Sequence, residues 1–525
     1  MSDESSRIGD AYRARLDRLS RERLEKVESL RERGVNPFAN GFEVTHTARS
    51  LFEGWGDRDA EQLQAAPIPV RVAGRLRLFR RMGKALFLKI QDGTCQPGLK
   101  DGALGPEETD NLLQVFVSRD AVGEEAFAQI RELDLGDIIG IDGVLIRTRT
   151  GELTVEARAV QLLTKSVRPL PEKFRGLSDI EQRFRQRYVD LIMNEDVRQI
   201  FLTRNRVLRA LRRFLDERGF LEVETPMMQV IQGGATARPF VTHHNALDME
   251  LFLRIAPELY LKRLLVGGFE RVYELNRNFR NEGLSRRHNP EFTMVEFYQA
   301  YATYEDLMDL TEELVQTLAR EVIAPREDGS LVVEAEGHEV LLSGSWRRLS
   351  VAAAVAEAYG VDEAQVADAG WLAARLQEGG VTLPAGSDAG RMLMELFELR
   401  VEHTLIQPTF IVDFPASVSP LARRKESNPE LVDRFELFVL GRELANAFSE
   451  LNDPEDQYTR FAAQLDAREA GDDEAMPMDE DYIRALEYGM PPAAGEGIGI
   501  DRLVMLLTGS DSIREVILFP HLRPE

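Results

Sequence analysis

The stretch that most constrains this chain runs from Arg271 to Tyr298, RVYELNRNFRNEGLSRRHNPEFTMVEFY. It predicts two extended runs joined by a basic loop, GLSRRHNP. Side chains two residues apart on a strand share a face, so the first run is expected to place Arg280 and Glu282 together. The second run groups Phe292, Met294, Glu296 and Tyr298. Such a face, covered by a cationic loop, can bind a nucleotide beside a small charged molecule.

A second signal lies near the C-terminus, where GIGIDR at residues 497–502 precedes the apolar run LVMLL. The glycine pair alone is weak, because it lacks the third glycine and the downstream acidic residue of a dinucleotide fingerprint. The chain also has no Walker A motif, so a nucleotide is not expected in a P-loop. The order and separation of GIGIDR and FRNE at 279–282 make the pair far more specific than either alone.

A third cluster lies in DRFELFVLGRELANAFSELND, where Glu436 and Glu443 flank Gly441. A turn at the glycine would bring the two carboxylates together, and paired oxygen ligands suit a Mg²⁺ ion that bridges phosphates. An exposed acidic hairpin is the alternative. Asn446, Phe448 and Glu450 lie two residues apart and share one strand face. Glu443 would lie on the opposite face of a regular strand. It can join their site only if the backbone bulges between 443 and 446.

Bulk properties narrow the class of protein. A chain of 525 residues is long enough for more than one domain. Its formal charge of -24 argues against a general nucleic-acid-binding protein, although it does not exclude a local basic stripe. No apolar run approaches the roughly 18 residues of a membrane span. Cys95 is the only cysteine, which excludes an internal disulfide, and the charged N-terminus has no apolar signal-peptide core. We expect a cytoplasmic protein without membrane or DNA partners.

Periodicity along the chain predicts four segments. Residues 1–66 form an N-terminal helical extension, and residues 67–165 give short strands in the order of an OB-fold, three strands, a helix and two strands. A linker at 166–185 leads into a large mixed domain at 186–525. That domain contains a helical insertion near 347–395.

Alternation in the expected OB-fold points one set of polar and aromatic side chains outward, namely Arg77, Phe87, Lys89 and Gln114. An exposed ring among cations suits single-stranded nucleic acid, because bases stack on the ring while cations hold phosphates. A surface phenylalanine covered by a loop is the alternative. The Gly/Pro-rich stretch 93–111 is expected to be a mobile insertion loop.

Together these segments resemble the class II lysyl-tRNA synthetases of bacterial type over nearly the whole chain. FRNE matches motif 2, GIGIDR matches motif 3, and VETP with Pro226 is similar to motif 1. The resemblance implies an α+β catalytic domain, built on an antiparallel sheet with helices, and an N-terminal anticodon-binding OB-fold barrel. It also implies a homodimer joined through motif 1. The chain departs from the family at the 93–111 insertion and at Ala447, where glycine is common.

The resemblance assigns residues to each ligand. The substrate lysine would be held by Gly234, Glu258, Arg280, Glu296, Tyr298, Asn446, Phe448 and Glu450, with Arg280 and Asn446 on its carboxylate. ATP would be held by Arg280, Glu282, His288, Asn289, Phe292, Glu436, Glu443 and Arg502. Within that set, Arg280 and Arg502 would be catalytic, and Glu436 and Glu443 would ligate Mg²⁺. The anticodon would be read by Arg80, Phe87, Gln114 and Glu152.

The implied function is the ATP-dependent attachment of L-lysine to lysine tRNA through a lysyl-adenylate. The three glutamates of the lysine set argue against an aspartyl or asparaginyl enzyme, since a substrate side-chain carboxylate would need cations. The alternative is a catalytically inactive, synthetase-like protein with a regulatory or binding role. Such a protein is expected to have lost an arginine or a metal carboxylate, and the sequence retains them all.

Overall fold

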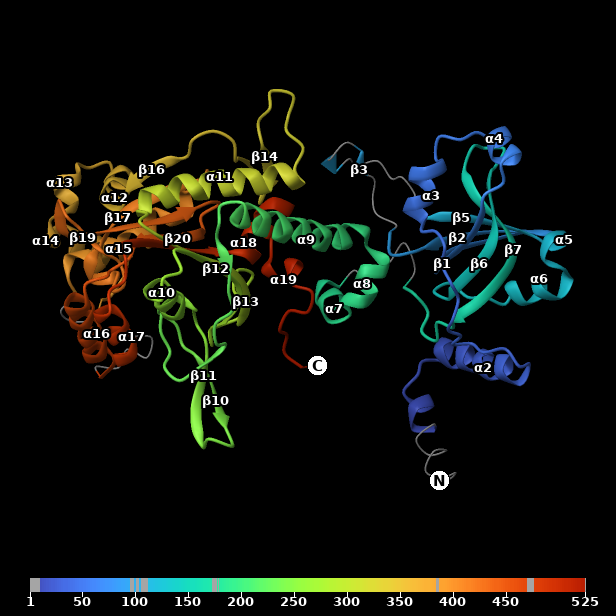
Figure 1. The fold of residues 1–525 in the computed structure, drawn as a ribbon, viewed down its shortest axis with the longest axis horizontal. Helices are drawn as coiled ribbons and strands as arrows, with labels where there is room; N and C mark the ends of the chain where they lie inside the picture. The colour runs from blue at the N-terminus through green and yellow to red at the C-terminus, as the bar shows by residue number, and fades with distance from the viewer. Residues whose placement is uncertain are drawn as a thin grey trace. The chain divides into compact units, whose positions relative to one another are not determined.

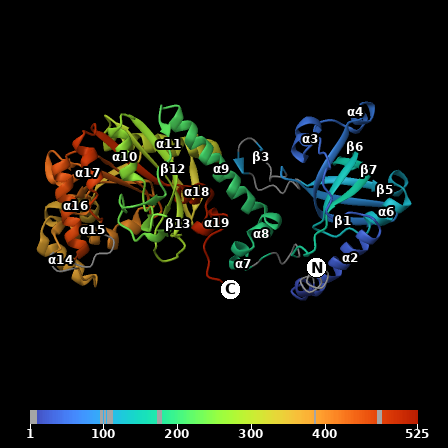
Figure 2. The same cartoon turned by 60° about the horizontal axis from the view of Figure 1, so that its bottom comes forward.

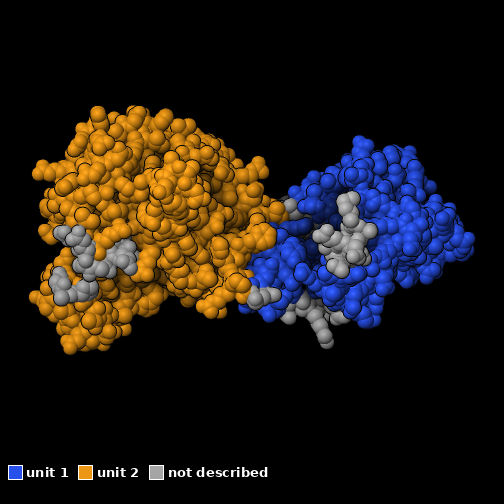
Figure 3. All heavy atoms as spheres, turned by 90° about the horizontal axis from the view of Figure 1, so that it is seen from below, with its two compact units in different colours: residues 1–100, 104–199 blue, residues 101–103, 200–525 orange. Residues whose placement is uncertain are grey.

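The computed structural model of the protein describes residues 10–94, 99–100, 103–104, 112–171, 177, 179–383, 387–469 and 476–524. The chain divides into two compact units, residues 1–100 with 104–199 and residues 101–103 with 200–525 (Figure 3). The segment boundaries expected from the sequence stay predictions. Most of the expected loop at 93–111 lies outside the described residues.

The first unit is a closed barrel in the strand order β1-β2-β5-β7-β6 (Figure 1). Apolar residues alternate along β1 and β2, and the inward set forms one buried core. The expected OB-fold barrel is therefore confirmed. Its strands are β1 (Pro69–Met82), β2 (Ala85–Gln91), β5 (Leu113–Ser118), β6 (Ile138–Arg147) and β7 (Leu153–Thr164). The smaller elements of this unit are α3 (Ala48–Trp55), α4 (Ala60–Ala65), β3 (Leu99–Lys100), α5 (Arg119–Val122), α6 (Glu124–Ile130), α7 (Ile180–Arg185) and α8 (Arg187–Met193). β4 (Ala103–Leu104), which pairs with β3, has one residue in each unit.

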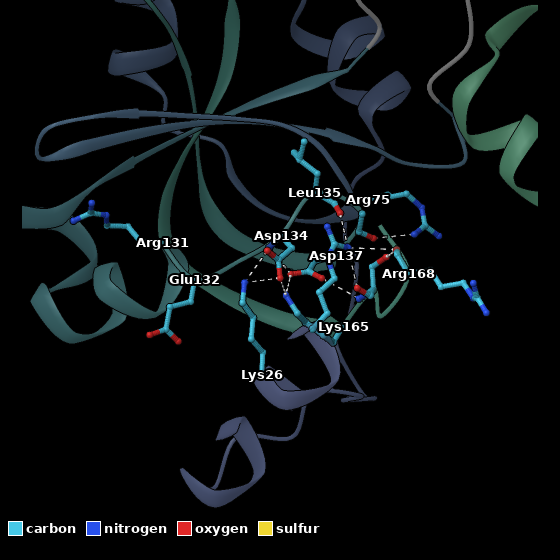
Figure 4. A network of polar contacts seen from close by, with 12 residues as sticks. Lys26, Arg75, Arg131, Glu132, Asp134, Leu135, Asp137, Lys165 and Arg168 are labelled. Carbon is cyan, nitrogen blue, oxygen red and sulfur yellow. Dashed lines mark hydrogen bonds and ion pairs between the residues drawn. The ribbon is translucent and has the colours of Figure 1, made fainter. Parts of the chain in front are cut away.

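A polar network ties the N-terminal helix α2 (Arg18–Glu32) to this barrel (Figure 4). Lys165 is 3% exposed, and its Nζ lies 2.5 Å from a carboxylate oxygen of Asp134 and 2.8 Å from one of Asp137. Lys26 of α2 reaches Asp134 at 2.8 Å. Buried charges are tolerated when they are paired, so this network fixes α2 against the barrel.

The second unit is built on a long, mostly antiparallel sheet in the order β16-β17-β19-β20-β21-β13-β12-β8. Its strands are β8 (Leu221–Glu222), β12 (Arg271–Phe279), β13 (Glu291–Ala300), β16 (Arg347–Ser350), β17 (Thr409–Pro415), β18 (Arg424–Lys425, paired with β19), β19 (Asn428–Phe438), β20 (Glu443–Ser449) and β21 (Ala493–Gly499). The pairs β12–β8 and β16–β17 are parallel. A sheet of this kind with helices matches the predicted α+β class.

Three helices cover one face of the sheet: α9 (Glu195–Asp216), α11 (Tyr304–Val322) and α18 (Ile500–Thr508) (Figure 1, Figure 2). Their apolar sides and the sheet residues of one parity, such as Val295 and Phe297, form the largest buried core. The residues of the other parity on β13 therefore face away from these helices. This second face carries the candidate site.

Further elements surround the sheet. The expected insertion is helical and has its own core against β17 and β19; it consists of α12 (Val351–Tyr359), α13 (Glu363–Val366), α14 (Ala369–Glu378) and α15 (Ala389–Arg400). The other elements are β9 (Met228–Gln229), β10 (Phe240–His244), β11 (Met249–Leu253), α10 (Glu258–Val266), β14 (Val332–Ala335), β15 (His338–Leu341), α16 (Pro454–Glu469), α17 (Glu480–Glu487), α19 (Ile513–Val516) and two short 3-10 turns at Glu402–Thr404 and Ala416–Val418. Within the described residues, no helix is both long enough and apolar enough to cross a membrane.

Candidate active site

The predicted hairpin at 271–298 is present, but its first strand is shorter than expected. β12 ends at Phe279, so Arg280 and Glu282 lie in the loop and the expectation that they share a strand face is wrong. The N–H of Arg280 still donates to the carbonyl of Pro290 at 2.9 Å. Pro290 has no N–H to donate to the carbonyl of Arg280 in turn, so the pairing between the two strands ends at this point. On β13 the predicted set from Phe292 to Tyr298 does share one face, because its core-facing neighbours have the other parity.

The second hairpin joins β19 to β20. Leu440 and Gly441 both adopt the left-handed conformation, with φ of 55° and 63°, which gives the tight turn expected at the glycine. Leu437 pairs with Ala445 and Phe438 with Glu443, so β20 carries one extra residue at this point. The predicted bulge between 443 and 446 is therefore confirmed. It turns Glu443 toward the same site as Asn446.

A cavity of about 240 Å³ lies between the motif 2 loop and the start of α18. Seven of the eight predicted ATP residues line it: Arg280, Glu282, His288, Asn289, Phe292, Glu443 and Arg502. The eighth, Glu436, lines an adjoining cavity. The structure thus brings together side chains from two hairpins and from motif 3.

The imidazole of His288 lines this cavity. Burial, followed by the charge of Arg502, lowers the pKa of His288 below its ordinary value. The hydroxyl of Ser285 accepts the N–H groups of Arg287 and His288, each at 3.0 Å, and lies 3.0 Å from Nδ1 of His288. Nε2 of His288 lies 3.5 Å from a guanidinium nitrogen of Arg502, which can only donate. The guanidinium charge beside the ring suits an anion.

Motif 3 is held by Asp501, which is 2% exposed. Its carboxylate accepts a hydrogen bond from Arg204 of α9 at 2.6 Å and one from the backbone N–H of Thr293 at 2.7 Å. The next residue, Arg502, donates to the carbonyl of Glu443 at 2.5 Å. A buried charge with two such partners is fixed in place, so Asp501 orients Arg502 toward the cavity.

A second cavity, of about 320 Å³, adjoins the first and shares Arg280, Met294, Glu443 and Gly497 with it. Seven of the eight residues predicted for lysine line this cavity: Gly234, Glu258, Arg280, Glu296, Tyr298, Asn446 and Phe448. Arg280 therefore lies where the two cavities meet. Its Nε is buried and has no hydrogen-bond partner among the described residues, which leaves this cation available to an anionic ligand.

The eighth residue, Glu450, lies directly behind the cavity wall and is 1% exposed. A Cβ atom at Gly495 would collide with Glu450 Oε1 and with the ring of Tyr298, so only glycine allows this close approach. Lys262 Nζ lies 2.5 Å from Glu450 Oε2 and forms an ion pair with it. Oε1 of Glu450 has no hydrogen-bond partner among the described residues, so this oxygen can still accept a hydrogen bond.

Burial sets the charge state of these carboxyl groups. Desolvation raises the pKa of Glu296 to about 8, and the neighbouring charges of Glu258 and Glu274 add to the effect. Desolvation also raises the pKa of Glu450 to about 8, although Lys262 opposes it. The deep end of the cavity is therefore a cluster of carboxyl groups that needs cationic partners to ionise fully.

Arg434 of β19 joins the two ligand sets. Its Nε donates to Asn446 Oδ1 at 3.2 Å and its Nη2 donates to Glu436 Oε1 at 2.5 Å. Since Asn446 accepts through its oxygen, its amide N–H groups are free to donate to a carboxylate. Glu436 is held beside the cavity that Glu443 also lines.

The carboxylate pair fits a divalent cation. Desolvation raises the pKa of Glu436 to about 7, and the charge of Glu443 adds to the rise. The surrounding cations are therefore too few to keep both carboxylates fully ionised. Within the described ranges, no three His, Cys, Asp or Glu side chains converge as a complete metal site. Two carboxylates suit a Mg²⁺ ion that takes its other ligands from phosphate and water.

Comparison with known proteins agrees with this geometry. Residues 179–523 match the family of class II tRNA synthetases (D, K and N). A lysine–tRNA ligase of Azoarcus sp. (strain BH72) is 55% identical over 505 residues, covering 96% of each chain. One from Thioalkalivibrio sulfidiphilus is 55% identical over 509 residues, covering 97% of this chain and 98% of that protein, and one from Magnetococcus marinus is 54% identical over 504 residues, covering 96% of each. The chain belongs to the class II lysyl-tRNA synthetase family.

The synthetase's barrel unit presents the predicted anticodon residues on one side of its sheet. Arg80 pairs with Phe87 across β1 and β2, and Lys89 pairs with Gln114 across β2 and β5. Lys89 Nζ contacts Glu152 at 3.0 Å. Gln114 points away from the barrel core but is only 8% exposed, and its amide donates to Thr154 Oγ1 at 2.9 Å.

The aromatic ring expected on this face is present and has a partner that the sequence analysis missed. The rings of Phe87 and Phe116 lie 5.1 Å apart, and the two residues are a cross-strand pair. Both are half-buried. Alternation along LLQVFVS places Phe116 on the same side as Gln114, and that signal was available in the sequence.

Two charged residues of the synthetase's catalytic unit also escaped the sequence analysis. Lys262 lies four residues after Glu258 on α10, a spacing that puts the two side chains on one helix face. Arg434 lies two residues before Glu436 on β19, so both share one strand face. Spacing could have found each pair, but only the fold shows that Lys262 reaches Glu450 and that Arg434 reaches Asn446.

Proposed function

We propose that this protein attaches L-lysine to lysine tRNA in two steps, through a lysyl-adenylate formed from ATP. One observation carries the proposal: a cavity walled by the buried carboxyl groups of Glu258 and Glu296, with Glu450 behind it, adjoins a cavity walled by Arg280 and Arg502. The first suits a substrate with two ammonium groups, and the second suits a triphosphate. Glutamates at the deep end disfavour an aspartate side chain.

The first step needs positioning rather than proton transfer. The carboxylate of lysine is already ionised, so it attacks the α-phosphorus of ATP and pyrophosphate leaves without a general base. Arg280, at the junction of the cavities, would bind the lysine carboxylate together with Asn446 and steady the charge on the α-phosphate. His288 and Arg502 would hold the outer phosphates. Fixed cations around a developing charge supply electrostatic stabilisation.

The remaining ATP assignments follow the walls of the nucleotide cavity. Phe292 would stack on adenine, while Glu282 and Asn289 would position the nucleotide. Mg²⁺, bound by Glu436 and Glu443, would neutralise phosphate charge when present. The retention of both arginines and both carboxylates around these cavities favours an active enzyme over an inactive binding protein.

In the second step, a terminal ribose hydroxyl of tRNA would attack the carbonyl carbon of the mixed anhydride, and the anhydride bond would break with AMP as the leaving group. We propose that the barrel binds the anticodon through Arg80, Phe87, Gln114 and Glu152. Phe87 is the only one of the four that offers a ring for base stacking, and the cation of Lys89 lies on the same strand. The cytoplasm, where lysine, ATP and tRNA are available, is the proposed location.

We further propose that the protein is a homodimer. Large apolar side chains are exposed on β8, on β9 and its neighbours and on the β10–β11 hairpin; they are Leu221, Met227, Met228, Val230, Val241 and Leu247. Exposed apolar side chains that gather in one surface typically mark an interface. Sedimentation of Met228→Lys tests this, because a charge placed in the interface should yield a monomer.

Amino-acid-dependent exchange between ATP and pyrophosphate tests the substrate assignment. Lysine should drive the exchange, whereas aspartate and asparagine should not. Faster exchange with aspartate than with lysine would overturn the proposal. Charging of lysine tRNA in the same preparation then separates a complete ligase from an enzyme that makes only the adenylate.

A further inference from the structure

Lys262 has no role in the reaction described above, yet it lies at the centre of the lysine cavity's charges. The side chain is fully buried, with 0% exposure. Its Nζ donates to Glu258 Oε1 at 2.5 Å and forms the ion pair with Glu450 Oε2 at 2.5 Å. Phe448 lies against it, with the ring centroid 5.1 Å from Nζ. A lysine is thus held by three of the residues assigned to the substrate lysine.

The charges at the deep end of this cavity explain why a protein lysine is needed. Among the described residues there, Glu258, Glu296 and Glu450 are the acids, and Lys262 is the cation that contacts Glu258 and Glu450. With all of them ionised the net charge is -2 (three carboxylates against one ammonium). The two ammonium groups of free lysine carry two positive charges, which match this value, while its carboxylate is assigned to Arg280 and Asn446. Without Lys262 the acids would exceed the substrate's cations by one and would retain a proton.

We propose that Lys262 is a positioning residue that favours the ionised forms of Glu258 and Glu450 and holds the two side chains apart, so that the ionised pocket has the charge that two ammonium groups require. This rests on the lysine pocket assigned above and goes beyond it, because Lys262 acts on the substrate through the two glutamates. The ammonium spans α10 and the end of β20, and so fixes the distance between two elements that are far apart in sequence.

Among the described residues, Lys262 is the cation in direct contact with Glu258 and Glu450, while Arg434 acts on Glu258 through its charge without an ion pair. Besides the two glutamates, Tyr482 of α17 faces Lys262, and its pKa is raised above 10, chiefly by burial, so it stays neutral. Arg434 is engaged by Glu436 and Asn446. Arg254 is engaged by Glu274 at 2.6 Å. Burial lowers the pKa of Lys262, but the two glutamates outweigh this and raise it, so the ammonium stays charged.

The decisive variant is Lys262→Met, which keeps the shape of the chain but removes its charge. We expect KM for lysine in pyrophosphate exchange to rise about tenfold or more, since a charge-assisted contact is lost, while KM for ATP changes little. We also expect the pH midpoint of kcat/KM for lysine to move upward by about one unit or more, because the glutamates lose the cation that favours their ionised form. A merely structural role would lower kcat/KM at every pH without moving the midpoint.

A charge-restoring double variant separates charge from shape. Lys262→Met combined with Glu258→Gln again has a net charge of -2 at the deep end, so its midpoint should return toward that of the wild type. A midpoint that stays where Lys262→Met puts it would overturn the proposal. If the methionine variant is recovered in poor yield, Lys262→Gln replaces it with the same expected shift.

Two controls make the outcome specific. Lys425→Met removes another paired lysine of the same unit, one that contacts Asp413 outside the cavities, and should leave the midpoint unchanged. Glu450→Gln tests the pocket itself. If Glu450→Gln weakens lysine use and Lys262→Met moves neither KM nor the midpoint, the inference about Lys262 is wrong and the pocket stands. If neither variant affects lysine use, the pocket assignment falls as well.

Discussion

At the scale of single residues, burial gives ordinary side chains their specific chemistry here. Glu450 is 1% exposed and lies against the backbone of Gly495, so water cannot satisfy its oxygens. A carboxylate in such a place binds an ammonium group much more strongly than one at the surface does, because both partners lose their competing hydration. Affinity for lysine therefore depends on a few atoms at the deep end of one cavity.

Replacing Glu450 with glutamine should weaken lysine activation. The substitution turns a charge-assisted contact into a neutral one, a loss of roughly 1.5–3 kcal/mol. This corresponds to a fall of about tenfold to a hundredfold in kcat/KM for lysine in pyrophosphate exchange.

Glu496→Gln is the matched control for Glu450→Gln. Burial raises the pKa of Glu496 well above its ordinary value, and its carboxyl faces Thr311 on the opposite side of the sheet. Glutamine there replaces a group that is already neutral, so lysine kinetics should be retained. An unchanged kcat/KM in Glu450→Gln would place Glu450 outside the pocket.

The same carboxyl groups predict a pH dependence. Burial raises the pKa of both Glu296 and Glu450 to about 8, and both must ionise to bind ammonium groups. The kcat/KM for lysine should therefore rise as pH increases through about 8, and lysine binding should release protons, measurable by calorimetry in buffers of different ionisation enthalpy. A pH-independent kcat/KM and the absence of proton release would contradict this.

Because folding raises these pKa values from 4.5, the unfolding free energy of the ligand-free protein should fall as pH rises between 4.5 and about 8.

At the scale of the elements, backbone irregularities decide which predictions from sequence hold. Parity alone groups Glu296 with Tyr298 correctly, because β13 is regular over that stretch. It fails for Arg280, since the strand ends one residue earlier, where Pro290 on the facing strand cannot donate. For Glu443, parity alone predicts the wrong face. The bulge in β20 turns the side chain to the site, and the sequence shows that a bulge is needed there but not that it forms.

The β19–β20 hairpin predicts the consequence of losing a metal ligand. Glu443→Ala should nearly abolish adenylate formation while leaving the fold and the oligomeric state intact, because the side chain is 41% exposed and contributes little packing. Pyrophosphate exchange at several magnesium concentrations measures the loss. Glu426→Ala, an exposed carboxylate of the neighbouring β18–β19 turn, is the control. Near-normal exchange by Glu443→Ala at ordinary magnesium would return the pair to a surface acidic hairpin.

At the scale of the whole molecule, the order of elements was predictable and their long-range contacts were not. Strand alternation and turn residues were enough to predict the barrel, and motifs 2 and 3 indicated the catalytic sheet. The pairing of Lys262 with Glu450 joins residues that are 188 positions apart (450 − 262), and nothing in the local sequence specifies it. The same holds for Arg204 and Asp501, which link the long helix α9 to motif 3. Local patterns predict elements, whereas sites depend on the packing between them.

The division into two units predicts that anticodon recognition and adenylate formation respond to different substitutions. Phe87→Ala should leave lysine-dependent pyrophosphate exchange unchanged, because Phe87 belongs to the barrel unit and the exchange reaction needs only the other one. It should weaken charging of lysine tRNA by the loss of base stacking, worth roughly 1–3 kcal/mol per base. The defect should shrink when the anticodon of the tRNA is replaced.

Phe38→Ala, at an exposed ring of the same unit outside the barrel strands, is the control and should charge normally. If Phe87→Ala charges tRNA normally, or impairs both reactions equally, Phe87 serves the fold and another part of the barrel binds the anticodon.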